Sequence, residues 1–432
     1  VSGPKEGNPF CDQWIKGTFC CKNEKKTVDG FYDGDGVYKV RFMPSFTDEY
    51  TFEIEASFDI NMGEEVPEHK LGIADGGKEA EKYVVRNMLT GSFTVTSPSA
   101  DNHGPVRVAG TYYLAYEDGT PYHCIGTTCY VWNLQNEELQ KQTLKTLEEN
   151  AFNKIRFCIF PKHYDYNLHE PITYPYEGTP CDSSVLNENN FAEYNGCAPG
   201  NDWDFTRFNP AHFQHIEKCI QALMKLGIEA DLIVMHPYDR WGFSMMQAED
   251  DDRYWKYVLA RFSAYRNVWW SLANEYDLMH EKTLSDWERY AGIICEKDPY
   301  HHLRSIHNCK AYYDYNLPWI THCSIQRTET YRSSELVNEW REKYHKPVVL
   351  DEICYEGNIQ FGWGNISGEE MTRRFWEAFC RGGYPGHGET YLSPDRILLW
   401  SHGGVLHGTS PERIKFLAKI MGETPGLGVE PM

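Results

Sequence analysis

The chain has 432 residues, a formal net charge of −21 and a pI of about 5.3. The phosphates of nucleic acids and the headgroups of anionic membranes would repel so acidic a chain, so we expect neither as a partner. The length is ample for a large core and for more than one domain.

The 14 cysteines do not have the spacing of a disulfide framework or a zinc site. No CxxC pair occurs, and Cys124, Cys158, Cys323 and Cys354 lie in or beside apolar, strand-like runs, where free thiols behave as small hydrophobic groups. We therefore expect a reducing compartment and a cytoplasmic bacterial protein rather than a secreted one. The alternative is a secreted protein that has lost its signal segment and pairs Cys181 with Cys197.

Residues 1–103 have the pattern of an all-β domain. Apolar and polar residues alternate over 37–42, 50–55 and 91–96, and glycine and aspartate residues mark turns between such runs. This many short strands predicts a small β-sandwich. We expect the domain to have a structural or dimer-forming role, which allows for a homo-oligomer.

From residue 104 to residue 432 strand-like and helix-like segments alternate, which predicts an α/β fold, a (β/α)8 TIM barrel. The expected strands are 122–127, 154–160, 229–236, 268–274, 303–307, 320–326, 348–351 and 397–400, and the expected helices are 137–149, 210–226, 250–265, 284–295, 333–344, 368–380 and 411–421. No glycine-rich nucleotide-binding motif is present. A long loop, 161–209, follows the second strand, so it should lie on the catalytic face and narrow the substrate pocket.

Two of the apolar runs end abruptly in a glutamate. The sequence VWWSLAN precedes Glu275, and PVVLD precedes Glu352. Such runs are typical of strands buried on both faces, and barrel enzymes carry catalytic groups at the carboxyl ends of these strands. The two carboxyl groups therefore form a candidate pair for breaking a glycosidic bond, in which one protonates the leaving oxygen and the other attacks the anomeric carbon.

The residues beside these glutamates refine the assignment and leave alternatives. Asn274 precedes Glu275 directly and can hydrogen-bond a sugar 2-hydroxyl. Asp351 competes with Glu352 because strand neighbours point to opposite faces, and Glu356 is a second competitor further along. A retaining mechanism needs the two carboxyls about 5–5.5 Å apart, with one protonated and one ionised.

Several segments resemble known glycosidases. Asn274, Glu275 and Glu352 resemble the catalytic residues of clan A glycoside hydrolases, which are retaining barrel enzymes. The segments GPVRV (104–108), DGTP (118–121), IGTT (125–128), GGYPGHGETY (382–391) and WSHGG (400–404) are similar to a group of bacterial glycosidases. That group joins a small N-terminal β domain to a barrel related to apiosidases and family-5-like enzymes. Its members often carry a further C-terminal β domain, which we expect to be absent or removed here.

The resemblance implies roles for several side chains. Glu275 would be the acid/base and Glu352 the nucleophile, with Arg156 keeping the nucleophile ionised. His236 would contact a sugar hydroxyl or the acid/base, and Trp400, at the end of the eighth expected strand, would form an aromatic platform under the sugar. Each of these three residues has an alternative role: Arg156 could form an ion pair in the barrel core, His236 could make a structural hydrogen bond, and Trp400 could be a core residue.

Other positions are less defined by the resemblance. Gln326 ends the sixth expected strand, where clan members often carry tyrosine or histidine, so its role is open. Further candidates for substrate contact on strand-end loops are Trp132, His163, His387 and Glu389. The 17 histidines include no HExxH motif, and a retaining mechanism needs no metal, so we expect no cofactor and no catalytic metal.

The leading hypothesis is an exo-acting retaining glycosidase whose substrate is a plant or microbial oligosaccharide or another glycoside. Aromatic residues make up 15% of the chain, and the long second loop and the strand-end aromatics suit a closed pocket that stacks on sugar rings. An endo-acting glycanase is the alternative within the same class. A catalytically inactive carbohydrate-binding barrel is the alternative from another class.

Overall fold

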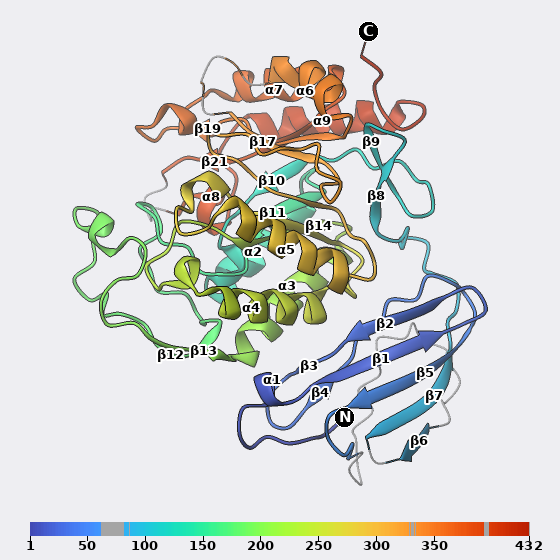
Figure 1. Cartoon of the computed structure of the whole chain (residues 1–432). Coiled ribbons are helices and arrows are strands. Elements are labelled where there is room, and N and C mark those ends of the chain that lie inside the picture. The colour runs from blue at the N-terminus through green and yellow to red at the C-terminus, as the bar shows by residue number, and fades with distance from the viewer. Residues whose placement is uncertain are drawn as a thin grey trace.

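The computed structural model describes residues 1–61, 82–85, 87–327, 329, 332, 334–392 and 397–431. A region made mostly of β-strands, coloured blue in Figure 1, lies at one end of the molecule. A barrel covered by helices makes up the larger part. The mixed α/β architecture with separate N-terminal antiparallel sheets confirms the predicted fold class.

The N-terminal region is built around a sheet with the strand order β2-β1-β5-β7-β6, and β3 pairs with β4 beside it. Alternating burial along β1 turns Ile15 and Phe19 toward an apolar cluster with Tyr50. Of the strand expected at 37–42, the two residues of β4 pair with β3, and Val37 forms a single antiparallel bridge with Ser2. The bounds are α1 Pro9–Asp12, β1 Ile15–Cys20, β2 Lys25–Asp29, β3 Phe31–Tyr32, β4 Tyr38–Lys39, β5 Glu49–Ala56, β6 Lys82–Val85 and β7 Met88–Thr94.

Eight parallel strands form the barrel, in the order β16-β15-β14-β11-β10-β20-β18-β17. A parallel bridge between His307 and Ser324 joins the two ends of this order. The strand bounds are β10 Gly126–Thr128, β11 Lys154–Cys158, β14 Glu229–Met235, β15 Val268–Ala273, β16 Arg304–Ser305, β17 Cys323–Gln326, β18 Val348–Glu352 and β20 Tyr384–His387. Strands β11, β14, β15 and β18 are buried along their whole length, and the mostly apolar sequence of β15 is typical of a strand covered on both faces.

Helices lie around the outside of the barrel (Figure 1). Local signals set their ends: the Asn209 side chain caps α3, Pro210 is its first residue, and Gly227, with φ of 70°, follows its end. The helix bounds are α2 Glu137–Glu148, α3 Pro210–Lys225, α4 Ala248–Phe262, α5 Leu284–Lys297, α6 Val337–Tyr344, α7 Gly368–Cys380, α8 Leu399–His402 and α9 Ser410–Glu423. The predicted start of α6, residue 333, lies outside the described residues. Short pairs outside the barrel are β8 Val106–Ala109 with β9 Tyr113–Tyr116, and β19 Glu356–Gly357 with β21 Glu389–Thr390.

The eighth barrel strand is not the predicted one. Residues 397–400 were expected to form it, but Leu399 and Trp400 begin helix α8, and β20 completes the barrel between β10 and β18. Its sequence, YPGH, favours a turn because it contains proline and glycine. The glycine has a packing reason instead. A Cβ on Gly386 would lie 2.5 Å from the carbonyl oxygen of Asp351, so only glycine allows β20 to lie this close to β18.

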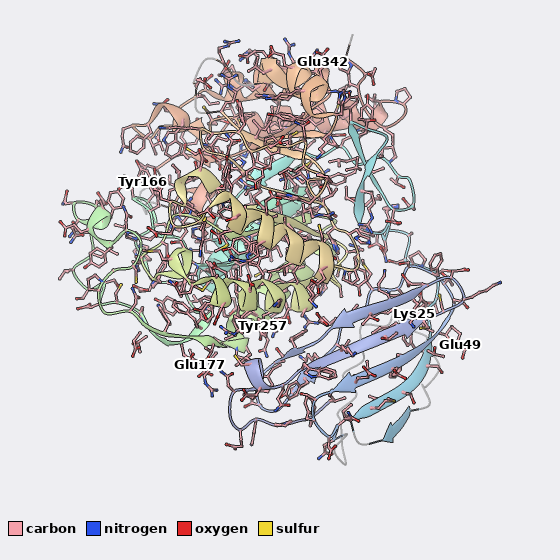
Figure 2. All side chains as sticks on the ribbon, in the orientation of Figure 1. Lys25, Glu49, Tyr166, Glu177, Tyr257 and Glu342 are labelled. Atoms are coloured by element: carbon pink, nitrogen blue, oxygen red, sulfur yellow. The ribbon has the colours of Figure 1, made fainter. Side chains whose placement is uncertain are left out.

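The long segment 161–209, expected to be a loop, contains a hairpin. Strand β12 (Tyr176–Thr179) pairs antiparallel with β13 (Asp202–Phe208). Tyr176 and Phe208 stack with their ring centroids 5.3 Å apart and belong to the main apolar cluster of the barrel. At the other end of the segment, the Tyr166 hydroxyl (labelled in Figure 2) donates a hydrogen bond of 2.6 Å to Gln360, in the loop after β18. Two loops of the catalytic face are thereby joined.

The N-terminal region is attached to the barrel by a network of buried charges. Arg41 donates to both carboxylate oxygens of Glu217 on α3, at 2.6 and 2.7 Å. Arg261 on α4 donates to the same carboxylate at 2.8 Å and lies 2.7 Å from Asp33. Tyr257, labelled in Figure 2 on the side of α4 that faces the β region, adds a hydrogen bond to a backbone carbonyl there. Each charge therefore has an opposite partner, as burial requires.

Two further observations concern the chain as a whole. All 14 cysteines, Cys181 and Cys197 included, are free thiols in this structure. Within the described ranges, no helix combines the length and the apolar character needed to span a bilayer.

Candidate active site

Glu275 and Glu352 lie at the carboxyl ends of β15 and β18, and both are buried, with 5% and 8% of their surface exposed. Gln326, at the end of β17, donates a hydrogen bond of 3.0 Å to Glu275 Oε1. The side-chain oxygen of Gln326 lies 3.0 Å from His307 Nε2, which is also 3.6 Å from Glu352 Oε1. The two carboxyl groups therefore share one polar cluster, joined through Gln326 and His307.

The backbone at Glu275 is unusual. Its φ of 51° and ψ of 56° place it in the left-handed region, which non-glycine residues rarely adopt. Such conformations persist only where the surrounding structure enforces them, and they concentrate at active sites. This one turns the chain immediately after the buried strand β15.

The surroundings of Glu275 favour its protonated form. Tyr238 donates a hydrogen bond to Oε2, and Asn274 Nδ2 donates to the same oxygen at 3.3 Å. Burial and the neighbouring charge of Glu352 nevertheless raise the pKa of Glu275 above its usual value. A carboxyl group in this state can give up a proton to a leaving group.

The surroundings of Glu352 favour its ionised form. Burial alone would raise its pKa, but the hydrogen bond and charge of His307, the charge of Arg156 and the hydroxyl of Tyr130 together lower the pKa of Glu352 to about 2. Arg156 Nη1 lies 3.7 Å from Glu352 Oε1, and Tyr130 donates to that same oxygen. Glu352 is therefore a carboxylate near neutrality, as a nucleophile must be.

Asp351, the competitor of Glu352, has a different place. Its carboxylate accepts a hydrogen bond of 2.6 Å from Lys154 and another from Ser324 Oγ. Lys154 also donates to Asp231 at 2.6 Å, which makes a buried ion network inside the barrel. Arg156 borders both this network and Glu352, because its Nε lies 3.8 Å from Asp351. Alternation along β18 thus separates the two acids.

Aromatic rings and a buried lysine surround the two carboxyl groups. Lys162 Nζ lies 3.5 Å from the ring centroid of Tyr130, 4.3 Å from that of Tyr238 and 4.5 Å from that of Trp400. Burial lowers the pKa of Lys162 to about 8. Trp400 meets Tyr130 edge to face at 5.5 Å, so it reaches the site from helix α8 although it is not part of a strand.

Two predicted histidines have protein partners instead. His236 Nε2 lies 3.3 Å from the carbonyl oxygen of Phe160, and burial lowers the pKa of His236 to about 3, so the ring is neutral. His163 lies within the long segment, where one nitrogen pairs with the carbonyl oxygen of Phe191 at 2.8 Å. Its other nitrogen accepts a hydrogen bond from Arg240 at 3.1 Å. The contacts of His163 occupy both of its ring nitrogens, whereas His236 Nδ1 is buried and has no hydrogen-bond partner among the described residues, so its contact with a sugar or the acid/base stays a prediction.

The structure does not bring three other predicted residues to the pair. Trp132 is fully buried and packs edge to face on Phe157 in the apolar core. His387 is fully buried, and Glu389, with 1% exposure, accepts hydrogen bonds from the backbone N–H groups of residues 407 and 408. Their contacts in this structure are with the core and with backbone groups, and a contact with substrate stays a prediction for all three.

Sequence reasoning missed four residues of the site: Tyr130, Lys162, Tyr238 and His307. A weak signal was present. Each lies at the end of an expected barrel strand or within a few residues of it, where catalytic groups of barrels gather. The sequence could not show which of the many strand-end aromatic and basic residues point toward the glutamates.

The chain is similar to known glycoside hydrolases. Residues 109–392 match the family described as "Apiosidase-like, catalytic domain", and residues 1–57 match one described as "Domain of unknown function (DUF5060)". A solved structure from Bacteroides vulgatus ATCC 8482, described as a "putative glycoside hydrolase", is 41% identical with a TM-score of 0.86, over 98% of this chain and 77% of that chain. No curated protein sequence matches this chain.

More distant structures share the fold alone. A glycoside hydrolase family 5 protein from Bacteroides vulgatus ATCC 8482 is 16% identical with a TM-score of 0.50, over 77% of this chain and 71% of that chain. An endo-1,4-beta-mannanase from Rhizomucor miehei is 12% identical with a TM-score of 0.51, over 74% of this chain and 100% of that chain.

Proposed function

Because the chain belongs to the apiosidase-like family of catalytic domains, we propose that it is a retaining glycoside hydrolase with Glu275 as acid/base and Glu352 as nucleophile. The observation that carries this proposal is the opposite effect of the site on the two carboxyl groups. Burial and a neighbouring negative charge raise the pKa of Glu275 and so favour its protonated form, whereas His307 and Arg156 lower the pKa of Glu352 and favour its ionised form. A retaining mechanism requires this division of states.

The reaction then takes two steps. In the first, the Glu352 carboxylate attacks the anomeric carbon while the proton of Glu275 passes to the departing glycosidic oxygen, which leaves a glycosyl ester on Glu352. In the second, the Glu275 carboxylate takes a proton from water, which attacks the anomeric carbon and frees Glu352. Asn274 would form a hydrogen bond with the sugar 2-hydroxyl. Its amide is held beside the catalytic pair, because it accepts a hydrogen bond from Arg156 and donates one to Glu275.

We further propose exo action on plant or microbial oligosaccharides. The contact between Tyr166 and Gln360 joins two loops of the catalytic face, and Tyr164 of the same segment packs on Trp400 at 5.8 Å. Loops joined in this way favour a pocket that admits a chain end over a groove that admits the middle of a chain. An endo-acting glycanase would instead release internal fragments from a polysaccharide.

The test is a panel of aryl glycosides with azide rescue. Wild-type protein should hydrolyse at least one substrate with retention of anomeric configuration, and Glu352→Ala should lose hydrolysis while azide restores a glycosyl azide of inverted configuration. Glu275→Ala should keep activity on substrates with good leaving groups, and azide should give a product of retained configuration. Glu249→Gln, on the exposed start of α4, is the matched control and should behave as wild type.

The outcomes separate the alternatives. If wild-type protein binds sugars but hydrolyses no glycoside in a broad panel, the inactive carbohydrate-binding barrel replaces the proposal. Products of inverted configuration from wild-type protein would refute Glu352 as nucleophile. Internal fragments from a polysaccharide would replace exo action by endo action and leave the catalytic roles intact.

A further inference from the structure

A second cluster of buried acidic groups lies apart from the catalytic pair. Glu356 begins β19, Glu389 begins β21, and His387 ends barrel strand β20. All three are buried, with exposures of 0%, 1% and 0%. Each offers one ligand atom, and these atoms all lie within 4.8 Å of one another. The chain thus brings two carboxylates and an imidazole together away from solvent.

The two carboxylates have no cationic side chain as partner within the described part of the chain. Most of their hydrogen bonds come from backbone N–H groups that lead into α9: those of residues 407 and 408 reach Glu389, and those of residues 409 and 410 reach Glu356. The hydroxyls of Tyr391 and Thr409 also donate to Glu356 Oε1, at 3.3 and 3.5 Å. A Cβ on Gly408 would lie 2.4 Å from a Glu356 oxygen and 2.7 Å from a Glu389 oxygen, so both carboxylates approach one point. Buried charge of one sign needs compensation by a cation or a proton.

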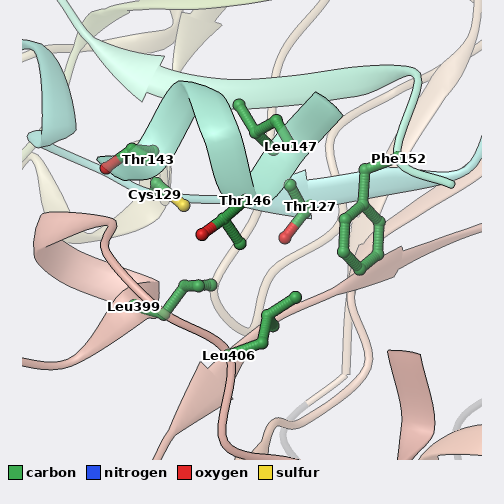
Figure 3. A pocket seen from close by; sticks show the side chains of 8 residues that line it. All are labelled: Thr127, Cys129, Thr143, Thr146, Leu147, Phe152, Leu399 and Leu406. Carbon is green, nitrogen blue, oxygen red and sulfur yellow. The ribbon is translucent and has the colours of Figure 1, made fainter. Parts of the chain in front are cut away.

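His387 is arranged as a metal-binding histidine is. Its Nδ1 lies 3.2 Å from Thr127 Oγ1, and its ring stacks on Phe152 at 4.8 Å. Its other nitrogen, Nε2, is buried and has no hydrogen-bond partner among the described residues. Thr127 and Phe152 line the small pocket shown in Figure 3. Thr127 lies on β10, directly beside His387 on the neighbouring strand β20. A partner on one ring nitrogen fixes the orientation of the ring and leaves the other for a metal.

We propose that Glu356, His387 and Glu389 bind a divalent metal ion that takes both carboxylate oxygen and imidazole nitrogen, such as Zn²⁺ or Mn²⁺. Calcium and magnesium prefer ligand sets made of oxygen alone, which the histidine does not fit. The ion would neutralise the buried carboxylates. Glu356 Oε2 and both oxygens of Glu389 each accept one backbone hydrogen bond and keep a lone pair for the ion.

The position of the site assigns the ion a structural role. Glu356 follows Tyr355, which packs on Trp400 with ring centroids 5.9 Å apart, and Trp400 lies in the chain between Glu389 and the turn at 407–410. One ion would therefore hold the loop after β18, the loop after β20 and the start of α9 together. The aromatic wall of the catalytic site belongs to these loops, so the ion would stabilise it without touching substrate.

The test uses the full chain, stripped with a chelator and then titrated with ZnCl2 or MnCl2. Calorimetry should give one site per chain, and metal should raise the melting temperature of the stripped protein. Thr127→Val, which keeps all three ligands, should weaken binding by about tenfold, and His387→Gln and Glu389→Gln, which each remove a ligand, should weaken it by a larger factor. His280→Gln, an exposed histidine away from the cluster, is the control and should bind as wild type.

Two results would overturn the proposal. Absence of binding to wild-type protein at millimolar metal would show that a proton compensates the two carboxylates. Equal binding by wild type, His387→Gln and Glu389→Gln would place the ion on other residues. Circular dichroism of each variant identifies any that fail to fold, and Thr127→Val then supplies the comparison. None of these results bears on the roles of Glu275 and Glu352.

Discussion

Replacing Tyr238 by phenylalanine should shift the basic side of the pH–activity profile. The Tyr238 hydroxyl donates a hydrogen bond to Glu275 Oε2 and so lowers the pKa that burial has raised. Phenylalanine keeps the ring, including its contact with Lys162 at 4.3 Å, and removes only the hydroxyl. Without this donor the ionised form of Glu275 is less stable, so its pKa rises further.

The size of the shift follows from the charge on the acceptor. A hydrogen bond to an ionised group contributes about 1.5–3 kcal/mol. Since one pKa unit corresponds to about 1.36 kcal/mol, the pKa of Glu275 should rise by roughly 1–2 units. The acid/base must be protonated in the first step, so activity should persist to a pH that is higher by the same amount.

The assay is kcat/KM for an aryl glycoside with a poor leaving group, measured from pH 5 to 10, because such a substrate depends on proton donation. Tyr164→Phe is the matched control. Tyr164 packs on Tyr238 at 5.1 Å, and its hydroxyl makes no hydrogen bond to either glutamate in the described structure. An unshifted basic limb in Tyr238→Phe, or an equal shift in Tyr164→Phe, would refute the assignment of Glu275 as the proton donor held by Tyr238.

Three further substitutions test other parts of the structure. Tyr130→Phe removes a hydrogen-bond donor to Glu352, so the pKa of Glu352 should rise by roughly 1–2 units. The acidic limb of the pH profile of kcat/KM should move to higher pH by the same amount. An acidic limb at the wild-type pH would contradict the role given to Tyr130. Arg41→Ala removes two contacts between the N-terminal region and Glu217 on α3, so it should lower the free energy of unfolding in urea by about 1–3 kcal/mol with kcat/KM unchanged. Equal stability would show that these contacts contribute little. Gly386→Ala places a Cβ 2.5 Å from a carbonyl oxygen of β18 and should cost at least about 1–3 kcal/mol or prevent folding; a variant as stable as wild type would contradict the position of β20.

Elements with local signals can be predicted from the amino-acid sequence. Buried strands such as β15 are continuous apolar runs because both of their faces are covered, and helices such as α3 carry their own cap and stop residues. A glutamate at the end of such a strand can be predicted as a site residue, because the barrel collects the carboxyl ends of its strands on one face. The sequence therefore sufficed for the fold class and for the candidate pair Glu275 and Glu352.

The identity of the eighth strand and of the side chains around the pair depends on contacts between segments that are distant in the chain. The sequence of β20 predicts a turn because it contains Gly386. This glycine is required by contact with β18, which is a neighbour in space and not in sequence. Tyr130, Lys162, Tyr238 and His307 come from four different strand ends, and no local pattern shows that their side chains converge. Their convergence, and the pKa differences that depend on it, arise from closure of the barrel, because electrostatic effects depend on distance in space rather than on separation along the chain.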